Sequence, residues 1–181
     1  MNTKYILIIL GEPYSTFSEI IGKYFVNNTK FKKKIIIIGN NKLLKAQLKN
    51  LNYLFSLNEI KNIEEAKKNI VNIIDVNFNY KKIYSKISSE SNNYLNKCFD
   101  IVLDIIKKNQ GKCILINGPI SKKTFLKKKY LGITEYLSKK TKAKHETMLI
   151  YNDNLSVSPI TTHIPIKYVS KNISKKKIKN N

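Results

Sequence analysis

Three short segments of the chain carry residues that could bind an anion or a metal ion, and each follows an apolar run. They are Gly11–Pro13, Gly118–Lys122 and Thr161–Pro165. In parallel α/β sheets ligands gather at the carboxyl ends of strands, so turns after strands are the first places to look for a site. We therefore expect the Gly11 loop, Lys122 and the nearby Thr134 to converge on one cleft.

The segment Gly118–Lys122 combines a glycine and a proline with Ser121 and Lys122 at the expected start of a helix. Backbone N–H groups at a helix start and a lysine ammonium can together hold an anion. An ordinary strand-to-helix turn with Ser121 as its cap has the same residues. The segment lacks the Gly-x-x-x-x-Gly-Lys pattern of a P-loop, so the residues alone leave both interpretations open.

His163 is the candidate metal ligand, because it is expected directly after a threonine-rich strand and Pro165 stiffens the backbone beyond it. A lone histidine is more often a structural residue than a ligand. The chain has two histidines, whereas zinc-type sites usually take three protein ligands. The other, His145, lies in a lysine-rich stretch before a strand, and we do not expect it to be a ligand.

Alternating strands and helices must position these turns. We expect strands at Tyr5–Leu10, Ile35–Ile38, Tyr53–Leu57, Val71–Val76, Cys113–Ile116, Met148–Tyr151 and Leu155–Thr161. We expect helices at Ser15–Val26, Lys42–Leu51 and Ser88–Lys108, from about Ser121 and near Thr134, and a frayed tail at Ser174–Asn181. This pattern predicts an α/β fold with a largely parallel sheet.

Composition indicates a globular protein, since 42% of the residues are hydrophobic. The apolar runs are shorter than the roughly 20 residues of a membrane span, and no cleavage site follows the first run. The sequence therefore predicts a cytoplasmic protein without a membrane partner. Cys98 and Cys113 lack metal-ligand spacing, and we expect small buried thiols.

The formal net charge of +22 taken alone would suggest a nucleic-acid partner. All 34 basic residues are lysine, however, and Asn and Ile are also abundant. These three amino acids have AT-rich codons, and nucleic-acid binders normally use arginine for bidentate contacts. A nucleic-acid partner is therefore the less favoured interpretation.

Four motifs in order carry a resemblance to one family. TTHIP at Thr161–Pro165 resembles the TTH-hydrophobic-P motif of the 4-hydroxythreonine-4-phosphate dehydrogenases, the PdxA family. GPISK is similar to that family's GP-x-x-K turn, and Gly132–Leu137 is similar to its GHTE motif. Gly11–Pro13 with Glu19 resembles its glycine-rich first loop. The resemblance spans the whole chain but about half of the family's usual length.

The resemblance implies an isocitrate/isopropylmalate-dehydrogenase-like α/β fold, with a first domain at 1–130 and an incomplete second domain at 131–181. It implies a homodimer that oxidises and decarboxylates 4-phosphooxy-L-threonine, a small phosphorylated amino acid, to 3-amino-2-oxopropyl phosphate in vitamin B6 biosynthesis. The cofactors would be NAD or NADP and a divalent metal such as zinc, magnesium or cobalt, which would polarise the reacting oxygen.

The resemblance also implies roles for single residues. His163 takes the place of the first of three metal-binding histidines, Thr134 that of a substrate-binding threonine, and Lys122 that of a substrate-binding lysine. Ile133 stands where the family has a substrate-binding histidine, and isoleucine cannot donate a hydrogen bond. Asn181 precedes the family's remaining metal histidines and most of its NAD site, so we expect the chain to be truncated and inactive alone.

The sequence leaves three hypotheses of different classes. The first is a truncated or impaired dehydrogenase. The second is a non-enzymatic α/β protein that binds a phosphorylated ligand at Lys122 and Thr134. The third, less favoured, is a basic nucleic-acid-binding protein.

Overall fold

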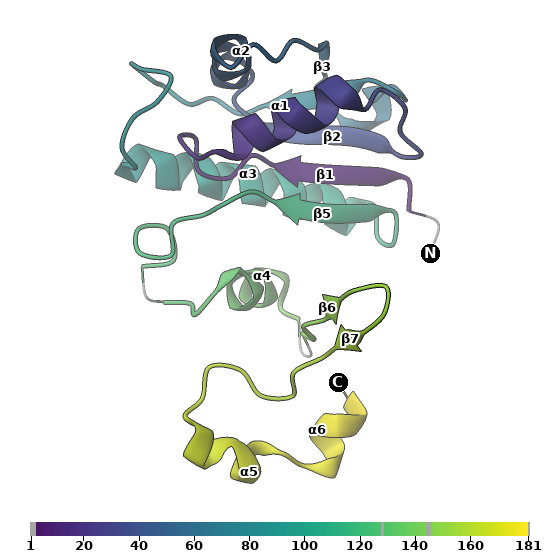
Figure 1. Ribbon diagram of the computed structural model, residues 1–181, viewed down its shortest axis with the longest axis vertical. Coiled ribbons are helices and arrows are strands. Elements are labelled where there is room, and N and C mark those ends of the chain that lie inside the picture. The colour runs from purple at the N-terminus through teal and green to yellow at the C-terminus, as the bar shows by residue number, and fades with distance from the viewer. Residues whose placement is uncertain (1–2, 128, 144–145, 181) are drawn as a thin grey trace. The chain divides into compact units, whose positions relative to one another are not determined.

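The computed structural model describes residues 3–127, 129–143 and 146–180. The chain divides into two compact units, residues 1–125 and 126–181. The first unit is built on five strands, which are β1 (Tyr5–Ile9), β2 (Lys34–Gly39), β3 (Leu57–Glu59), β4 (Val71–Asp75) and β5 (Cys113–Asn117). Their order is β3-β4-β2-β1-β5, and every neighbouring pair is parallel (Figure 1). The prediction of a mixed α/β fold with a largely parallel sheet is confirmed.

The central strand β2 shows why the sheet is parallel and covered on both faces. Its apolar run is buried from Ile35 to Gly39 rather than on alternate residues, as expected when helices cover both faces. Ile35 and Ile37 belong to a core cluster with Phe25 and Leu44 from two helices. The residues between them point to the opposite face, because side chains alternate along a strand.

Helices α1 (Phe17–Asn27) and α2 (Asn41–Asn50) cover one face of the sheet, and α3 (Ser89–Lys108) covers the other (Figure 1). A short 3-10 helix, η1 (Ile63–Glu65), lies between β3 and β4. The Asn40 side chain caps α2 by accepting a hydrogen bond from the Leu43 N–H at 2.9 Å.

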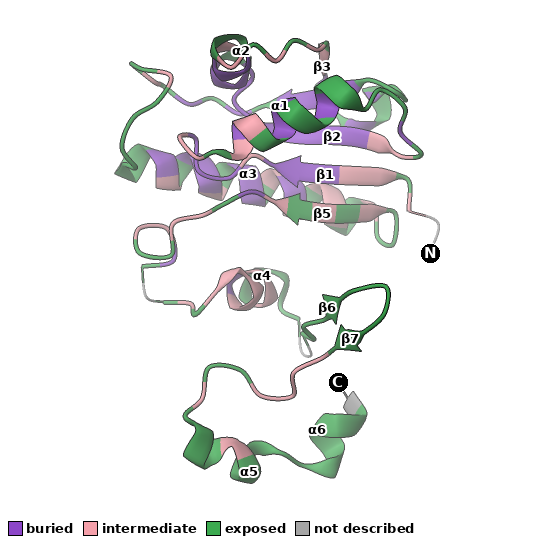
Figure 2. Ribbon diagram, in the orientation of Figure 1, coloured by how far each residue is buried: buried purple, intermediate pink, exposed green. Residues whose placement is uncertain are grey.

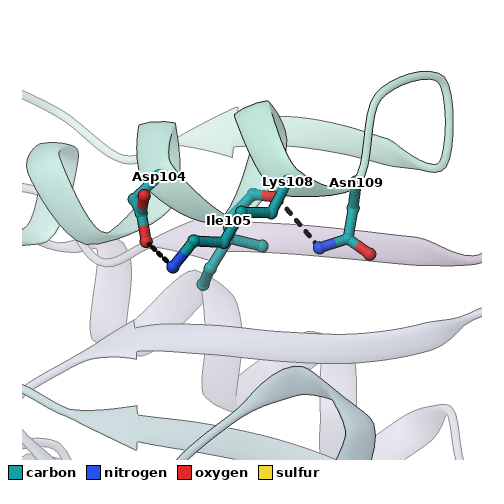
Figure 3. Close-up of polar contacts among 4 residues, drawn as sticks. All are labelled: Asp104, Ile105, Lys108 and Asn109. Carbon is teal, nitrogen blue, oxygen red and sulfur yellow. Dashed lines mark hydrogen bonds and ion pairs between the residues drawn. The ribbon is translucent and has the colours of Figure 1, made fainter.

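Helix α3 matches the predicted range Ser88–Lys108 within one residue. Its apolar residues recur every three or four positions and are buried, namely Tyr94, Leu95, Cys98, Phe99 and Val102. The Ser88 side chain accepts from the Ser91 N–H at 3.3 Å in a capping box. At the other end Lys108 pairs with Asp104 at 2.7 Å, and Asn109 Nδ2 donates to the Ile105 carbonyl at 3.1 Å (Figure 3).

The second unit consists of short elements. They are α4 (Ile133–Thr141), the antiparallel pair β6 (Ile150–Tyr151) and β7 (Ser156–Val157), the 3-10 helix η2 (Ile166–Tyr168), α5 (Val169–Asn172) and α6 (Lys175–Asn180). Figure 2 shows β6 and β7 exposed, while the buried residues concentrate in the sheet and α3 of the first unit. Among the helices within the described ranges, none is long and apolar enough to cross a membrane.

Several local predictions are wrong. The expected helix from Ser121 is a run of turns in the described residues, and Lys127 has a left-handed φ of 46°, through which no helix can continue. The expected strand Leu155–Thr161 is reduced to Ser156–Val157 in a hairpin. The strand expected at Tyr53–Leu57 lies instead at Leu57–Glu59.

The tail contains a helix that was not expected from its composition. Residues Lys175–Asn180 form α6. Ser174 Oγ accepts from the Lys177 N–H at 3.2 Å, which caps this helix, and lysine is a good helix former.

Candidate functional site

Two of the three predicted turns meet at the carboxyl edge of the sheet. Strands β1 and β5 are parallel neighbours, so the loop at Gly11–Pro13 and the turn at Gly118–Lys122 leave the sheet side by side (Figure 1). The Glu12 N–H donates to the Pro119 carbonyl at 2.7 Å. The structure therefore joins these two segments as one surface of the first unit.

Glycine is required on both sides of this contact. Gly11 has a φ of +75°, and a side chain on it would overlap the backbone of Gly118 and Pro119. A side chain on Gly118 would overlap the Leu10 carbonyl in turn. The close approach of the two loops thus depends on the missing Cβ atoms.

Glu12 is buried beneath this surface, with 5% of its area exposed. It lines a cavity of about 10 Å³ together with Ser18, Gln47 and Tyr94. Burial raises the pKa of the Glu12 carboxyl, and the nearby Ser91 hydroxyl opposes this in part. Neither carboxylate oxygen reaches a partner with hydrogen-bond geometry among the described residues. The cavity is about the size that one water molecule needs.

The turn after β5 offers an exposed ammonium group. Ser121 Oγ accepts from the Thr124 N–H at 3.3 Å, and the Phe125 N–H donates to the Ser121 carbonyl at 2.9 Å. This forms a single helical turn that Ser121 caps. Lys122 follows the cap and is exposed, so its side chain is free to contact an anion from solvent.

Ile133 and Thr134 occupy the first turn of α4 in the second unit. Gly132 precedes them with an extended backbone and supplies no side-chain cap. Both side chains are half-buried. The Thr134 hydroxyl can donate and accept a hydrogen bond beside the free N–H groups of the helix start, whereas Ile133 adds only apolar surface.

His163 does not follow a strand directly, which corrects the expectation. It lies in the loop between β7 and η2, is exposed, and has a left-handed φ of 56°. It shares the second unit with Ile133 and Thr134, whereas Lys122 belongs to the first unit. The convergence of the Gly11 loop, Lys122 and Thr134 on one cleft stays a prediction, and His145 lies outside the described residues.

The described residues do not fit a complete metal site. Within the described ranges, no three His, Cys, Asp or Glu side chains come together closely enough to hold an ion. His163 would supply one ligand, and structural or catalytic zinc usually takes three or four from the protein.

A polar network at the ends of β2 and β4 was not predicted from the sequence. The Asn40 N–H donates to the Tyr94 hydroxyl at 3.0 Å, and Asn40 Nδ2 donates to the Val76 carbonyl at 3.1 Å. The Asn41 N–H donates to Asp75 Oδ1 at 2.7 Å. The only sequence signal was the Asn-Asn pair after a strand, which indicates a turn but not its partners. This network fixes the carboxyl edge beside the Gly11 loop.

Comparison with known proteins decides the family. A family model described as pyridoxal phosphate biosynthetic protein PdxA matches residues 31–181. The chain belongs to the PdxA family. The matched range contains Lys122, Ile133, Thr134 and His163, and Gly11–Pro13 precedes it.

Relatives in the PdxA family support this assignment over nearly the whole chain. A 4-hydroxythreonine-4-phosphate dehydrogenase of a Sulfurihydrogenibium species is 31% identical over 94% of this chain and 53% of its own length. The enzyme of the same name from Aquifex aeolicus is 32% identical over 98% of this chain and 55% of its own. The chain spans about half the length of the curated relatives it matches.

A solved PdxA structure agrees in fold. The crystal structure of a 4-hydroxythreonine-4-phosphate dehydrogenase from Burkholderia phymatum superposes with a TM-score of 0.84 at 18% identity. The match covers 97% of this chain and 55% of that one.

Proposed function

We propose that this chain supplies part of the substrate site of a 4-hydroxythreonine-4-phosphate dehydrogenase of vitamin B6 biosynthesis. The reaction is oxidation and decarboxylation of 4-phosphooxy-L-threonine with NAD or NADP. The observation that carries the proposal is the family match over residues 31–181, which contains all four candidate site residues. A cytoplasmic location and a homodimer complete the proposal.

The residues of this chain would hold the substrate by its charged end. The exposed Lys122 ammonium would contact the phosphate, since a charge-assisted hydrogen bond contributes about 1.5–3 kcal/mol. The Thr134 hydroxyl would hydrogen-bond a second polar group of the substrate. Ile133 cannot do so, and a buried polar group left unpaired beside it costs about 1–3 kcal/mol. We therefore propose weakened substrate binding.

The first test measures binding rather than turnover. In titration calorimetry we expect the chain to bind 4-phosphooxy-L-threonine more tightly than L-threonine. Lys122→Gln should weaken binding by about tenfold, as expected for one charge-assisted contact. Lys123→Gln is the matched control, because Lys123 is the adjacent exposed lysine. Equal binding of phosphorylated and unphosphorylated ligands would refute the role of Lys122.

Ile133→His tests the departure from the family pattern. A histidine would restore a hydrogen-bond donor at the start of α4, and we expect binding to tighten by about 1–3 kcal/mol. Lys139→His, at an exposed position in the last turn of the same helix, is the control. An unchanged or weaker affinity in Ile133→His would remove this position from the proposed site.

The second test measures activity. We expect no NADH formation at 340 nm by the 181-residue chain with added zinc, magnesium or cobalt. The reason is that one described imidazole is far from a complete ligand set and cannot fix an ion's geometry. Metal-dependent NADH formation that disappears in His163→Ala would show that the chain completes the site by other means.

The second candidate function is non-enzymatic binding of a phosphorylated ligand. It is favoured by Ile133, which stands where the family has a substrate-binding histidine. The reading frame after Asn181 discriminates the two candidates. A continuation that encodes two further histidines of a metal site would favour the enzyme, and its absence from the gene would favour the binding protein.

A further inference from the structure

An open hollow of about 620 Å³ lies in the first unit beside the start of α3. We call it the lysine hollow and define it by Lys81, Lys82, Lys86, Tyr14, Tyr80 and Glu90. It contains none of the residues of the proposed substrate site. All of its lining residues belong to the first unit, so its shape is set within one compact body.

The two walls of the lysine hollow are anchored to the core. Gln47, buried on α2, donates through Nε2 to the Pro13 carbonyl at 2.8 Å and to the Ile83 carbonyl at 2.9 Å. One bond holds the loop that carries Tyr14, and the other holds the segment that carries the lysines. Because these two segments are already held in place, a ligand would lose less binding free energy to ordering them.

An aromatic contact fixes the Tyr14 wall further. The Tyr14 ring packs edge-on against Phe78, with ring centres 5.9 Å apart, and Phe78 packs in turn against Tyr94 at 5.1 Å. Tyr94 is buried in α3. Tyr14 therefore presents a braced aromatic surface to the hollow rather than a mobile side chain.

The charge of the lysine hollow favours an anion. Lys81, Lys82 and Lys86 place three ammonium groups on its lining, against the single carboxylate of Glu90. Lysine ammonium groups bind phosphate as point charges with three donors each. Ser85, Ser88 and Ser89 add hydroxyl groups to the same lining. The net positive charge and the donors match a ligand with more than one phosphate group.

The volume of the lysine hollow and its two tyrosines indicate which class of ligand it can bind. The volume lies in the range of about 300–1,000 Å³ typical of small-molecule sites and far exceeds what a lone phosphate fills. Tyr14 and Tyr80 offer aromatic surface on which a flat ring can stack. We propose that the lysine hollow binds a nucleotide, with its phosphates at the lysines and its base against the tyrosines. This site is independent of the proposed dehydrogenase function.

The test uses ADP as the probe in titration calorimetry at 0.15 M salt. We expect saturable binding that weakens on the order of tenfold or more in the variant Lys81→Gln/Lys82→Gln/Lys86→Gln, because three charged contacts are lost. The control variant Lys30→Gln/Lys32→Gln/Lys68→Gln removes the same charge from exposed residues in the segments that lead into β2 and β4, at the other edge of the sheet. It should change affinity by less than about twofold. Far-UV circular dichroism checks that both variants fold.

Further variants and ligands distinguish a specific nucleotide site from non-specific attraction of anions to a basic chain. Glu90→Gln removes the opposing carboxylate and should tighten ADP binding, whereas Glu64→Gln, an exposed control outside the hollow, should not. Pyrophosphate and adenosine should each bind more weakly than ADP. Equal losses in both triple-lysine variants, or absence of saturable binding, would overturn the proposal. Pyrophosphate binding as tight as that of ADP would overturn the role of the tyrosines.

Discussion

The two units of the chain differ in how they bury their apolar residues. In the first unit, β1, β2 and β4 lie inside a parallel sheet covered by helices on both faces, and Ile36, Ile37 and Ile73 are fully buried. In the second unit large apolar side chains remain exposed, including Tyr151 at 71% and Ile166 at 90%. The first unit thus has a core that can hold its loops in place, whereas the second gains little stability from burial.

This difference bears directly on the candidate site. The backbone of the Gly11 loop is held against the turn at Gly118 by the hydrogen bond from the Glu12 N–H to the Pro119 carbonyl, whereas the Lys122 side chain beyond that turn is exposed. Thr134 and His163 belong to the weakly buried unit, and ordering them would consume part of the binding energy. We therefore expect the first unit to dominate both stability and any affinity of the isolated chain.

The largest expected effect is loss of a core aromatic from the first unit. Phe99 is fully buried in α3, and its ring stacks on Phe125 with centres 5.7 Å apart. Phe99→Ala should lower the free energy of unfolding by about 3–5 kcal/mol, since it leaves a cavity. Urea unfolding followed by circular dichroism measures this. A loss below about 1 kcal/mol would mean that the first unit lacks a tightly packed core.

The next prediction compares the stability cost of backbone strain alone with the cost of strain combined with a steric clash. Gly11 and Gly111 both have positive φ, at +75° and +71°, but only Gly11 is packed against another loop. Gly111→Ala should cost about 1–2 kcal/mol through strain alone, and Gly11→Ala should cost more because Cβ also displaces Pro119. Thermal unfolding of the two variants gives the comparison. Equal losses would show that the contact between the two turns is loose.

A smaller effect concerns the buried Glu12 carboxyl. Its folded pKa is raised by burial, so the fold favours the protonated form. The contribution of this raised pKa to the free energy of unfolding is fully present below the unfolded pKa of about 4.3. It is lost as the pH rises through the folded pKa. Glu12→Gln keeps the shape without the charge. We expect it to be about 1 kcal/mol more stable than the native chain at pH 7, and the advantage to vanish near pH 4.

Urea unfolding at the two pH values measures the effect of Glu12→Gln. Glu19→Gln is the control, because Glu19 is partly exposed on α1 and pairs with Lys23 at 2.8 Å. A stabilisation that is the same at both pH values would show that Glu12 is ionised without penalty.

The smallest expected effect is on the exposed second unit. Tyr151→Ser on β6 should change the free energy of unfolding by less than about 0.5 kcal/mol, because the side chain is largely exposed. Urea unfolding, as for Phe99→Ala, gives the free energies of unfolding by which the two variants are compared. A cost near that of Phe99→Ala would show that Tyr151 is covered in solution, for instance by another copy of the chain, which sedimentation would detect.

How well each element could be predicted from the sequence follows how far it is buried rather than which unit it belongs to. The buried strand around Ile36 and helix α3 were predicted closely, because continuous apolar runs and three-or-four spacing report directly on burial. The turns at Gly11 and Gly118 were predicted because glycine and proline follow an apolar run in each. Their direct contact depends on the pairing of β1 with β5, which no local pattern specifies.

Prediction failed where burial is slight. The Leu155–Thr161 segment has the composition of a strand, but the β6–β7 ladder is only two residues long. The segment from Ser121 has the composition of a helix, but Lys127 has a left-handed backbone. The left-handed backbone of His163 could not be predicted either, since only a few per cent of non-glycine residues adopt a positive φ. The lysine hollow could not be predicted, because its lysines have the same sequence context as solvated surface lysines. Only the three-dimensional placement beside Tyr14 distinguishes them.

The position of β1 between β2 and β5 has a consequence for how the chain is made. Tyr5 pairs with both Lys34 and Cys113. The edge of β1 that pairs with β5 therefore stays unpaired until residues near Asn117 have left the ribosome. Closing a loop of this length carries a larger entropic cost than pairing β1 with β2. We expect nascent chains to hold an incomplete β1–β2–β4 sheet during synthesis, exposed to chaperones until β5 arrives.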